Sequence, residues 1–162
     1  MFLAQQGIEP SRKPIVVFQP GAAFPSKRWP ADSFITLGKL LAGEGWHVVV
    51  SGAPQERELA ESIAHSIAES CISIAGVVTF RQTLSILAHS KVCVTGDTAL
   101  MHAAAGLGVQ AIALFGPTSP VETGPYGAGH YVLAGRCTER PCFRQRCDSR
   151  GCMRSISPEI VH

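Results

Sequence analysis

The sequence predicts an α/β domain with a Rossmann-like, doubly wound parallel sheet. Five short apolar runs are spaced along the chain, and stretches with helical periodicity separate them. Such runs are typical of parallel strands that are buried on both faces, and right-handed crossovers between them build an open sheet with helices on each side. Turns that contain glycine follow the first, second and fourth of these runs, at the sheet edge where ligands bind in this architecture.

The expected strands are Ile15 to Phe18, Val48 to Ser51, Cys71 to Ile74, Val92 to Thr95 and Ala111 to Phe115. Apolar residues at intervals of three and four predict helices between them. The shared faces are Phe34, Leu37, Leu40 and Leu41, then Leu59, Ile63 and Ile67, then Leu84, Leu87 and Ala88. Residues 124–129 are expected to form a loop rich in Gly and Pro, and Ser157-Pro158-Glu159 predicts a further helix start.

Composition excludes several classes of protein. A chain of 162 residues is one ordinary domain that can bury its own core. Its net charge of +2, with 16% charged residues and no basic block, argues against nucleic acid as a partner. No stretch approaches the roughly 18 apolar residues of a membrane span, and the first residues lack the features of a signal peptide. We therefore expect a soluble, cytoplasmic protein.

The segment Gly96 to His102 turns an apolar strand into a helix and sets polar groups at that junction. The first N–H groups of a helix have no intrahelical partner, and the helix dipole places roughly half a positive charge there. An anion such as a diphosphate is stabilised at this point. The alternative is that Asp97 or Thr98 only caps the helix, as such residues routinely do. Met101 is expected to be a core residue.

A second loop, Gln19 to Pro30, follows the first strand and precedes a helical pattern. Because the carboxyl ends of parallel strands lie at one edge, this loop and the segment after Gly96 are expected to border the same crevice. Lys27 is then able to reach a phosphate as a point charge. Alternatively, Lys27 and Arg28 form a solvated basic pair. Trp29 is expected to be a hydrophobic anchor in either case.

Four groups of residues, in their order and spacing, carry a resemblance to a known family. They are Pro20-Gly21-Ala22 with Lys27-Arg28-Trp29-Pro30, Ser51-Gly52-Ala53-Pro54-Gln55-Glu56, Gly96-Asp97-Thr98 with Met101-His102-Ala103-Ala104, and Leu114-Phe115-Gly116-Pro117-Thr118. Over roughly residues 14 to 161, the chain resembles the family 9 glycosyltransferases, which include the ADP-heptose:lipopolysaccharide heptosyltransferases. In that family, these segments form the carboxyl-terminal half of a two-domain GT-B enzyme, the half that binds the nucleotide-sugar donor.

The resemblance implies a donor site built from these motifs. The expected donor-binding residues are Ala22, Ala23, Lys27, Glu56, Asp97, Thr98, Ala99, Leu100 and His102. Among them, Lys27 and the amides of Thr98 to Leu100 would bind the diphosphate, and Glu56 would accept hydrogen bonds from ribose hydroxyls. Asp97 and His102 would orient the sugar or the loop. For His102, the alternative is a partly buried helix histidine bonded to a neighbouring carbonyl.

One position departs from the family pattern. The family usually has Gly where this chain has Ala99. If the backbone needs a positive φ there, alanine would be strained, whereas a helical φ would not strain it.

The implied reaction is transfer of heptose from ADP-heptose to the lipopolysaccharide inner core, with inversion at the anomeric carbon. Lys27 would stabilise the departing ADP, and no cofactor is required. The family's catalytic base lies in an amino-terminal acceptor domain whose opening motif is absent here, and the full enzyme could associate peripherally with the inner membrane. We therefore expect residues 14–162 to be a donor domain that is inactive alone, preceded by a tail or linker remnant at residues 1–13. The alternative is a stand-alone nucleotide-binding or scaffold module without catalysis.

The six cysteines fall into two groups. Cys71 and Cys93 lie in expected strands and are predicted to be small core residues. The other four are Cys137, Cys142, Cys147 and Cys152, at intervals of five. They could form disulfides, bind zinc or remain thiols. Because the spacing matches no standard zinc pattern and the cytoplasm is reducing, we favour thiols and expect no metal.

Overall fold

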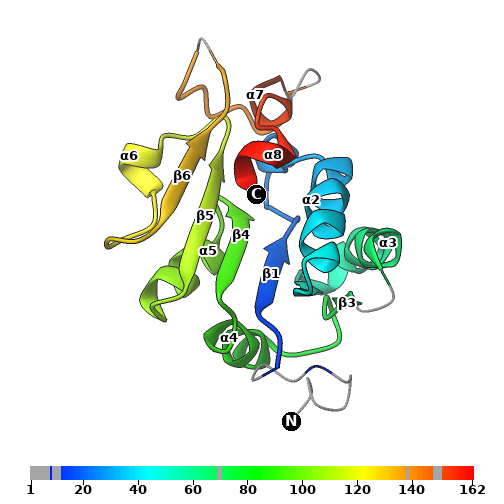
Figure 1. Ribbon diagram of the computed structural model, residues 1–162. Coiled ribbons are helices and arrows are strands. Elements are labelled where there is room, and N and C mark those ends of the chain that lie inside the picture. Colours follow the sequence, from blue (N-terminus) through cyan, green and yellow to red (C-terminus); the bar gives the residue numbers. More distant parts are fainter. Residues whose placement is uncertain (1–7, 9–11, 69–70, 138, 148–150) are drawn as a thin grey trace.

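The structure is a computed structural model that describes residues 8, 12–68, 71–137, 139–147 and 151–162. Among these residues, six parallel strands form one sheet in the order β3-β2-β1-β4-β5-β6 (Figure 1). The chain starts in the middle of the sheet, winds out to one edge, and then returns to build the other. This order is the doubly wound Rossmann-like arrangement that the sequence predicts.

The strands are β1 (Ile15–Gln19), β2 (His47–Val50), β3 (Ile72–Ser73), β4 (Val92–Gly96), β5 (Gln110–Phe115) and β6 (Tyr131–Ala134). The helices are η1 (Pro25–Lys27), α2 (Ala31–Gly43), η2 (Pro54–Glu56), α3 (Arg57–Ile67), α4 (Phe80–Ala88), α5 (Ala99–Gly106), α6 (Pro120–Thr123), α7 (Gly151–Arg154) and α8 (Pro158–Val161). All five expected strands are present, although β3 is shorter than predicted. Strand β6 was not predicted from the sequence, because this edge strand is largely exposed and lacks the signal of a buried run.

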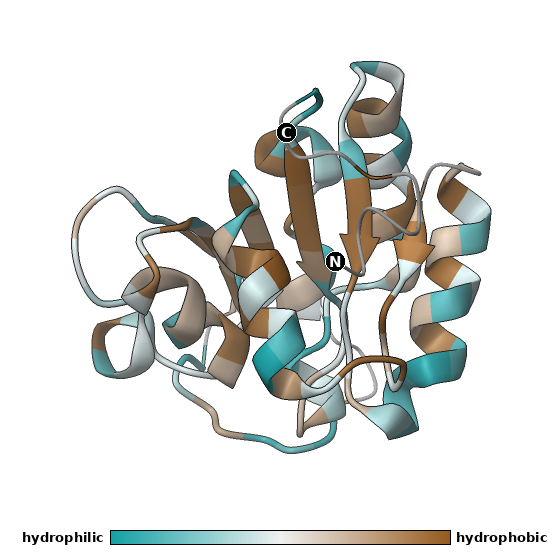
Figure 2. Ribbon diagram, turned by 90° about the horizontal axis from the view of Figure 1, so that it is seen from below, coloured by the Kyte–Doolittle hydropathy of each residue, from teal (hydrophilic) through white to brown (hydrophobic). Residues whose placement is uncertain are grey.

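Two layers of side chains cover the sheet, because successive residues of a strand point to opposite faces. On one face, Val16 and Phe18 of β1 belong to a core cluster with residues of α2 and α3. On the other face, Ile15 and Val17 belong to a cluster with residues of α4 and α5. Figure 2 shows the apolar strands at the centre and helices that carry hydrophilic residues around them. The sheet is therefore buried on both faces in its centre.

The predicted tail at residues 1–13 lies mostly outside the described residues. Ile8 is described, and it is buried in the second cluster beside Ile15 and Val17. At this one position, the chain packs on the domain core. The division into a tail at residues 1–13 and a domain at residues 14–162 stays a prediction.

Trp29 anchors the loop that follows β1, as the sequence predicts. Its side chain is 3% exposed, and its indole Nε1 donates a hydrogen bond of 2.9 Å to the carbonyl oxygen of Ile156. The ring packs edge-on against Phe34 with 4.9 Å between centroids, and Phe34 in turn contacts Phe18 at 5.3 Å. This aromatic cluster ties the loop, helix α2 and strand β1 together.

Cys71 and Cys93 are buried, which confirms their predicted place in the core. Burial raises the pKa of each thiol to about 12. Both side chains therefore stay protonated at neutral pH and act as small apolar residues.

Replacing the central aromatic residue of this cluster is expected to destabilise the fold strongly. Phe34→Ala should lower the free energy of unfolding by about 3 to 5 kcal/mol, because it removes a buried ring and leaves a cavity. Urea unfolding followed by circular dichroism measures the change. Leu40→Ala on the same helix is the matched control, since Leu40 is 41% exposed and should lose much less. Equal losses for the two variants would contradict this account of the core.

Candidate functional site

A cavity of about 630 Å³ opens at the carboxyl ends of β1, β2 and β4. Its volume lies within the range of small-molecule sites, which is roughly 300 to 1,000 Å³. Of the nine residues expected at a donor site, eight line this cavity. They are Ala22, Ala23, Glu56, Asp97, Thr98, Ala99, Leu100 and His102. The fold therefore brings together groups that are as far as 80 residues apart in the sequence (22 to 102).

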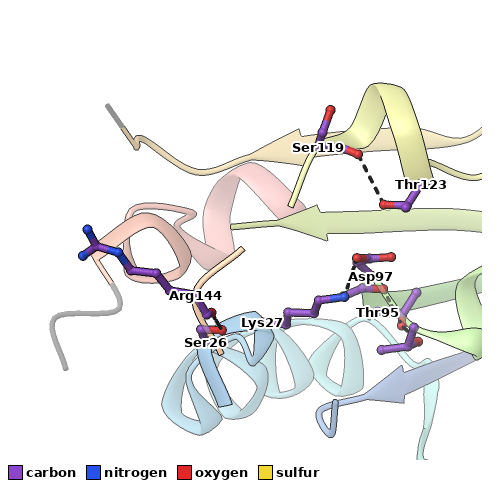
Figure 3. A network of polar contacts seen from close by, with 9 residues as sticks. Ser26, Lys27, Thr95, Asp97, Ser119, Thr123 and Arg144 are labelled. Carbon is purple, nitrogen blue, oxygen red and sulfur yellow. Dashed lines mark hydrogen bonds and ion pairs between the residues drawn. The ribbon is translucent and has the colours of Figure 1, made fainter. Parts of the chain in front are cut away.

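Lys27, the ninth expected residue, does not line the cavity but pairs with Asp97, which does. Its Nζ lies 2.6 Å from Oδ2 of Asp97, and the two side chains are 16% and 10% exposed. Figure 3 shows the lysine side chain reaching from η1 to the aspartate that follows β4. The loop backbone also approaches closely, because a Cβ added at Gly96 would lie 3.1 Å from the carbonyl oxygen of Lys27. The expectation of a solvated basic pair is wrong for Lys27.

The neighbouring Arg28 also has a structural partner. Its guanidinium donates to the carbonyl oxygen of Ala22 from Nε at 3.1 Å and from Nη2 at 2.9 Å. These two bonds fold the loop back on itself and fix the backbone of Ala22 at the cavity wall. Ser26, from the same loop, donates its hydroxyl proton to the carbonyl oxygen of Arg144 (Figure 3). The loop is thus fixed by hydrogen bonds within it, from Arg28, and by one to the segment that contains Arg144.

Helix α5 begins at the cavity, and no side chain caps its first amide groups. Thr98 occupies the N-cap position, but its hydroxyl pairs with that of Thr95 at 2.8 Å, and Asp97 pairs with Lys27. The alternative that Asp97 or Thr98 only caps the helix is therefore wrong. The amides of the first turn and the positive end of the helix dipole face the cavity, which favours an anion.

The structure tests three further expectations for this helix. Ala99 lies within α5, and among the described residues only Phe143 combines a positive φ with a side chain. Alanine at this position is therefore unstrained. His102 is exposed and lines the cavity, so the alternative of a partly buried, carbonyl-bonded histidine is wrong. Met101 is fully buried, as expected.

Glu56 is held against the backbone on the opposite side of the cavity. Its Oε2 accepts a hydrogen bond of 2.9 Å from the amide of Ala53 and one of 3.4 Å from Nε2 of Gln19. The carboxylate lies where a side chain at Gly21 would start, because a Cβ built there would be 2.0 Å from Cδ of Glu56. The absence of a side chain at position 21 therefore leaves room for the Glu56 carboxylate.

Sequence reasoning missed one wall of this cavity. Val78, Phe80 and Thr83 line it from the start of α4 and the loop before it, and Phe80 is 60% exposed. These residues form no motif in the sequence. The available signal was topological, because the loop after β3 must reach the same edge as the loops after β1 and β2.

The four cysteines near the end of the chain line a separate cavity of about 340 Å³. Burial raises the pKa of Cys152, and the three neighbouring thiols raise it further. Within the part of the chain that the structure describes, no group of three or more His, Cys, Asp or Glu side chains is arranged to hold a metal ion. The assignment of these four cysteines as thiols stays a prediction.

None of the helices formed by the described residues is long and apolar enough to cross a membrane.

Comparison with known proteins gives consistent matches. A profile of glycosyltransferase family 9 (heptosyltransferase) matches residues 3–152. Lipopolysaccharide heptosyltransferase 2 of Salmonella typhimurium is 38% identical over 120 residues, which cover 71% of this chain and 34% of that protein. The structure of Escherichia coli ADP-heptose lps heptosyltransferase II aligns with a TM-score of 0.82 and 30% identity, over 98% of this chain and 47% of that one.

A second solved structure is that of E. coli heptosyltransferase WaaC with ADP-2-deoxy-2-fluoro heptose. It aligns with a TM-score of 0.74 and 25% identity, over 92% of this chain and 41% of that one. The chain spans between a third and a half of the length of these relatives. Because the family profile covers most of the sequence and the fold agrees, the chain belongs to glycosyltransferase family 9, the heptosyltransferase family.

Proposed function

We propose that the cavity at the ends of β1, β2 and β4 binds the ADP part of an ADP-heptose donor, for transfer of heptose to a lipopolysaccharide core. The observation that carries this proposal is the meeting of Lys27 and Asp97 at the start of helix α5. A cation that is paired with a cavity residue lies there beside the uncapped amides of a helix that begins at the cavity. One relative is named as an ADP-heptose heptosyltransferase, and another was solved with ADP-2-deoxy-2-fluoro heptose, which supports the choice of nucleotide sugar.

In this proposal, the diphosphate occupies the end of the cavity that Lys27 and α5 form. The ammonium group has three N–H donors, so one can stay with Asp97 while the others meet phosphate oxygens. The amides of Thr98, Ala99 and Leu100 add donors, and the helix dipole adds positive potential. Charge that develops on the departing ADP is stabilised by the same groups. This arrangement requires no metal ion or other cofactor.

The rest of the nucleotide extends toward η2 and α4. Glu56 lines the cavity there and would accept hydrogen bonds from ribose hydroxyls, while Val78 and Phe80 offer an apolar surface for the base. His102, which belongs to α5, lines the same cavity and would lie near the heptose. The site thus presents polar groups to each polar part of the donor.

Transfer also needs a base for the acceptor hydroxyl and a place for the lipopolysaccharide core. We propose that an amino-terminal half, as in the longer relatives, supplies both, and that these residues alone bind donor without transferring sugar. Glu56 and Asp97, the carboxylates that line the cavity, already have partners in Ala53 and Lys27. The complete enzyme would work at the cytoplasmic side of the inner membrane.

The first test is isothermal titration of the chain with ADP. Saturable binding is expected, and Lys27→Ala should weaken it about tenfold to a hundredfold, because a charge-assisted contact to the diphosphate is lost. Adenosine, which has no phosphate, should show little difference between the two proteins.

The control is Lys39→Ala, which removes an exposed lysine of α2 away from the cavity. It should leave ADP binding unchanged. If the folded chain binds no ADP, the donor-site proposal is wrong and the stand-alone scaffold alternative is favoured. If Lys27→Ala and Lys39→Ala behave alike, the assignment of the phosphate position is wrong.

A second test uses the contact between Gly21 and Glu56. Gly21→Ala should weaken ADP binding at least about tenfold, because its new methyl group would displace the carboxylate. Gly106→Ala is the matched control, since nothing lies within 4 Å of a Cβ there, and α5 should tolerate it. The melting temperature of each variant measures whether the fold is intact. Full ADP affinity in a folded Gly21→Ala variant would exclude Glu56 from the binding site.

A further inference from the structure

Gln19, the last residue of β1, connects two polar groups at the edge of the cavity. Its Oε1 lies 3.0 Å from the hydroxyl of Ser51, and its Nε2 lies 3.4 Å from Oε2 of Glu56 and 3.4 Å from the carbonyl oxygen of Gly21. Ser51 directly follows β2, and its amide bonds to the carbonyl oxygen of Phe18 at 2.8 Å. Strand pairing therefore holds Gln19 and Ser51 next to each other.

The chemistry of the partners fixes the orientation of the Gln19 amide. The carboxylate of Glu56 and the carbonyl oxygen of Gly21 accept hydrogen bonds and cannot donate them, so the NH2 group must face them. The amide oxygen then faces Ser51, whose hydroxyl donates to it. Because Ser51 is 3% exposed, its hydroxyl has little access to water as an alternative partner. The hydrogen bonds from Ser51 to Gln19 and from Gln19 to Glu56 thus run in one direction.

This network fixes only one side of the carboxylate. The hydrogen bonds from Ala53 and Gln19 both reach Oε2 of Glu56. The carboxylate also lies flat against Gly21, where even a methyl group would not fit. With Oε2 held in this way, rotation of the carboxylate is restricted and Oε1 has a defined position at the cavity. An acceptor held in one position is favourable for recognising a hydroxyl group.

We infer that Gln19 is a positioning residue that orients Glu56 toward the ribose hydroxyls and so sets a preference for a ribonucleotide over a 2′-deoxyribonucleotide. The inference rests on the proposed donor site and adds to it how that site selects the sugar of the nucleotide. Gln19 also lines the cavity, but both ends of its amide are engaged with Ser51 and Glu56, so its part is to position Glu56. Ser51 supports it from the next strand.

The test is the ratio of the affinities for ADP and 2′-deoxy-ADP, measured by titration. The chain should bind ADP about tenfold or more tightly than 2′-deoxy-ADP, since the deoxy compound lacks a hydroxyl for a charged acceptor. Glu56→Gln should bring the ratio close to one. Gln19→Leu, which keeps the size of the side chain, should reduce the ratio at least threefold, and Ser51→Ala should reduce it by less.

Two controls separate this effect from a general disturbance. Gln110→Leu removes a glutamine at the start of β5 whose Nε2 donates to the carbonyl oxygen of Gly129 at 3.3 Å, and it should keep the full ratio. Gln19→Glu places a second carboxylate beside Glu56 and should abolish the preference, which gives a second variant if Gln19→Leu does not fold. Binding of inorganic pyrophosphate should be the same in the unchanged protein, Gln19→Leu, Ser51→Ala and Gln110→Leu, because these variants change neither the charge of the cavity nor the phosphate position.

The outcomes distinguish this inference from the proposal on which it rests. If the chain itself does not bind ADP, the donor site is wrong and the inference fails with it. If ADP binds and Glu56→Gln loses the preference while folded Gln19→Leu and Gln19→Glu keep it, the positioning role of Gln19 is wrong and the donor site stands. Loss of the preference in Glu56→Gln and both Gln19 variants, with pyrophosphate binding unchanged in Gln19→Leu, supports the inference.

Discussion

The pairing of β1 with both β2 and β4 is the constraint on which the site depends. Phe18 is opposite Val50 of β2 and opposite Val94 of β4, so all three strands end at nearly the same level. Their parallel direction puts three loops at one edge. The contacts between Lys27 and Asp97 and between Gln19 and Glu56 cross between these loops, and neither would form if one strand were shifted or reversed.

The electrostatics of the cavity follow from the same arrangement. Lys27 meets Asp97, while Glu56 meets an amide and the NH2 group of Gln19, so the charges near the cavity have partners before any ligand enters. A site with paired charges avoids the cost of isolated buried ions. It also keeps the lysine extended toward the start of α5. Lys27 and the first amides of α5, which are proposed to bind the diphosphate, would then already be in position.

The sequence was sufficient to predict those features that depend on local pattern. Buried strands, the helix after Gly96 and the anchor at Trp29 each leave a periodic or positional signal, and the resemblance identified the cavity residues. The exposed edge strand β6 and the apolar wall at Phe80 leave no such signal, because they arise from tertiary pairing and from loop placement. The Gln19 network could not be foreseen either, since a glutamine that ends a strand has no characteristic partner until the neighbouring strand is placed beside it.

The central claim is that the three loops at this edge form one nucleotide site. Backbone amide shifts of the labelled 17.2 kDa chain, followed by NMR during titration with ADP, test it most directly. The largest changes are expected to occur together, in the amides of Gly21 to Ala23, of Ala53, Gln55 and Glu56, and of Thr98 to Leu100. Saturating changes confined to another surface, such as β6 and α8, or the absence of changes at these three loops, would contradict it.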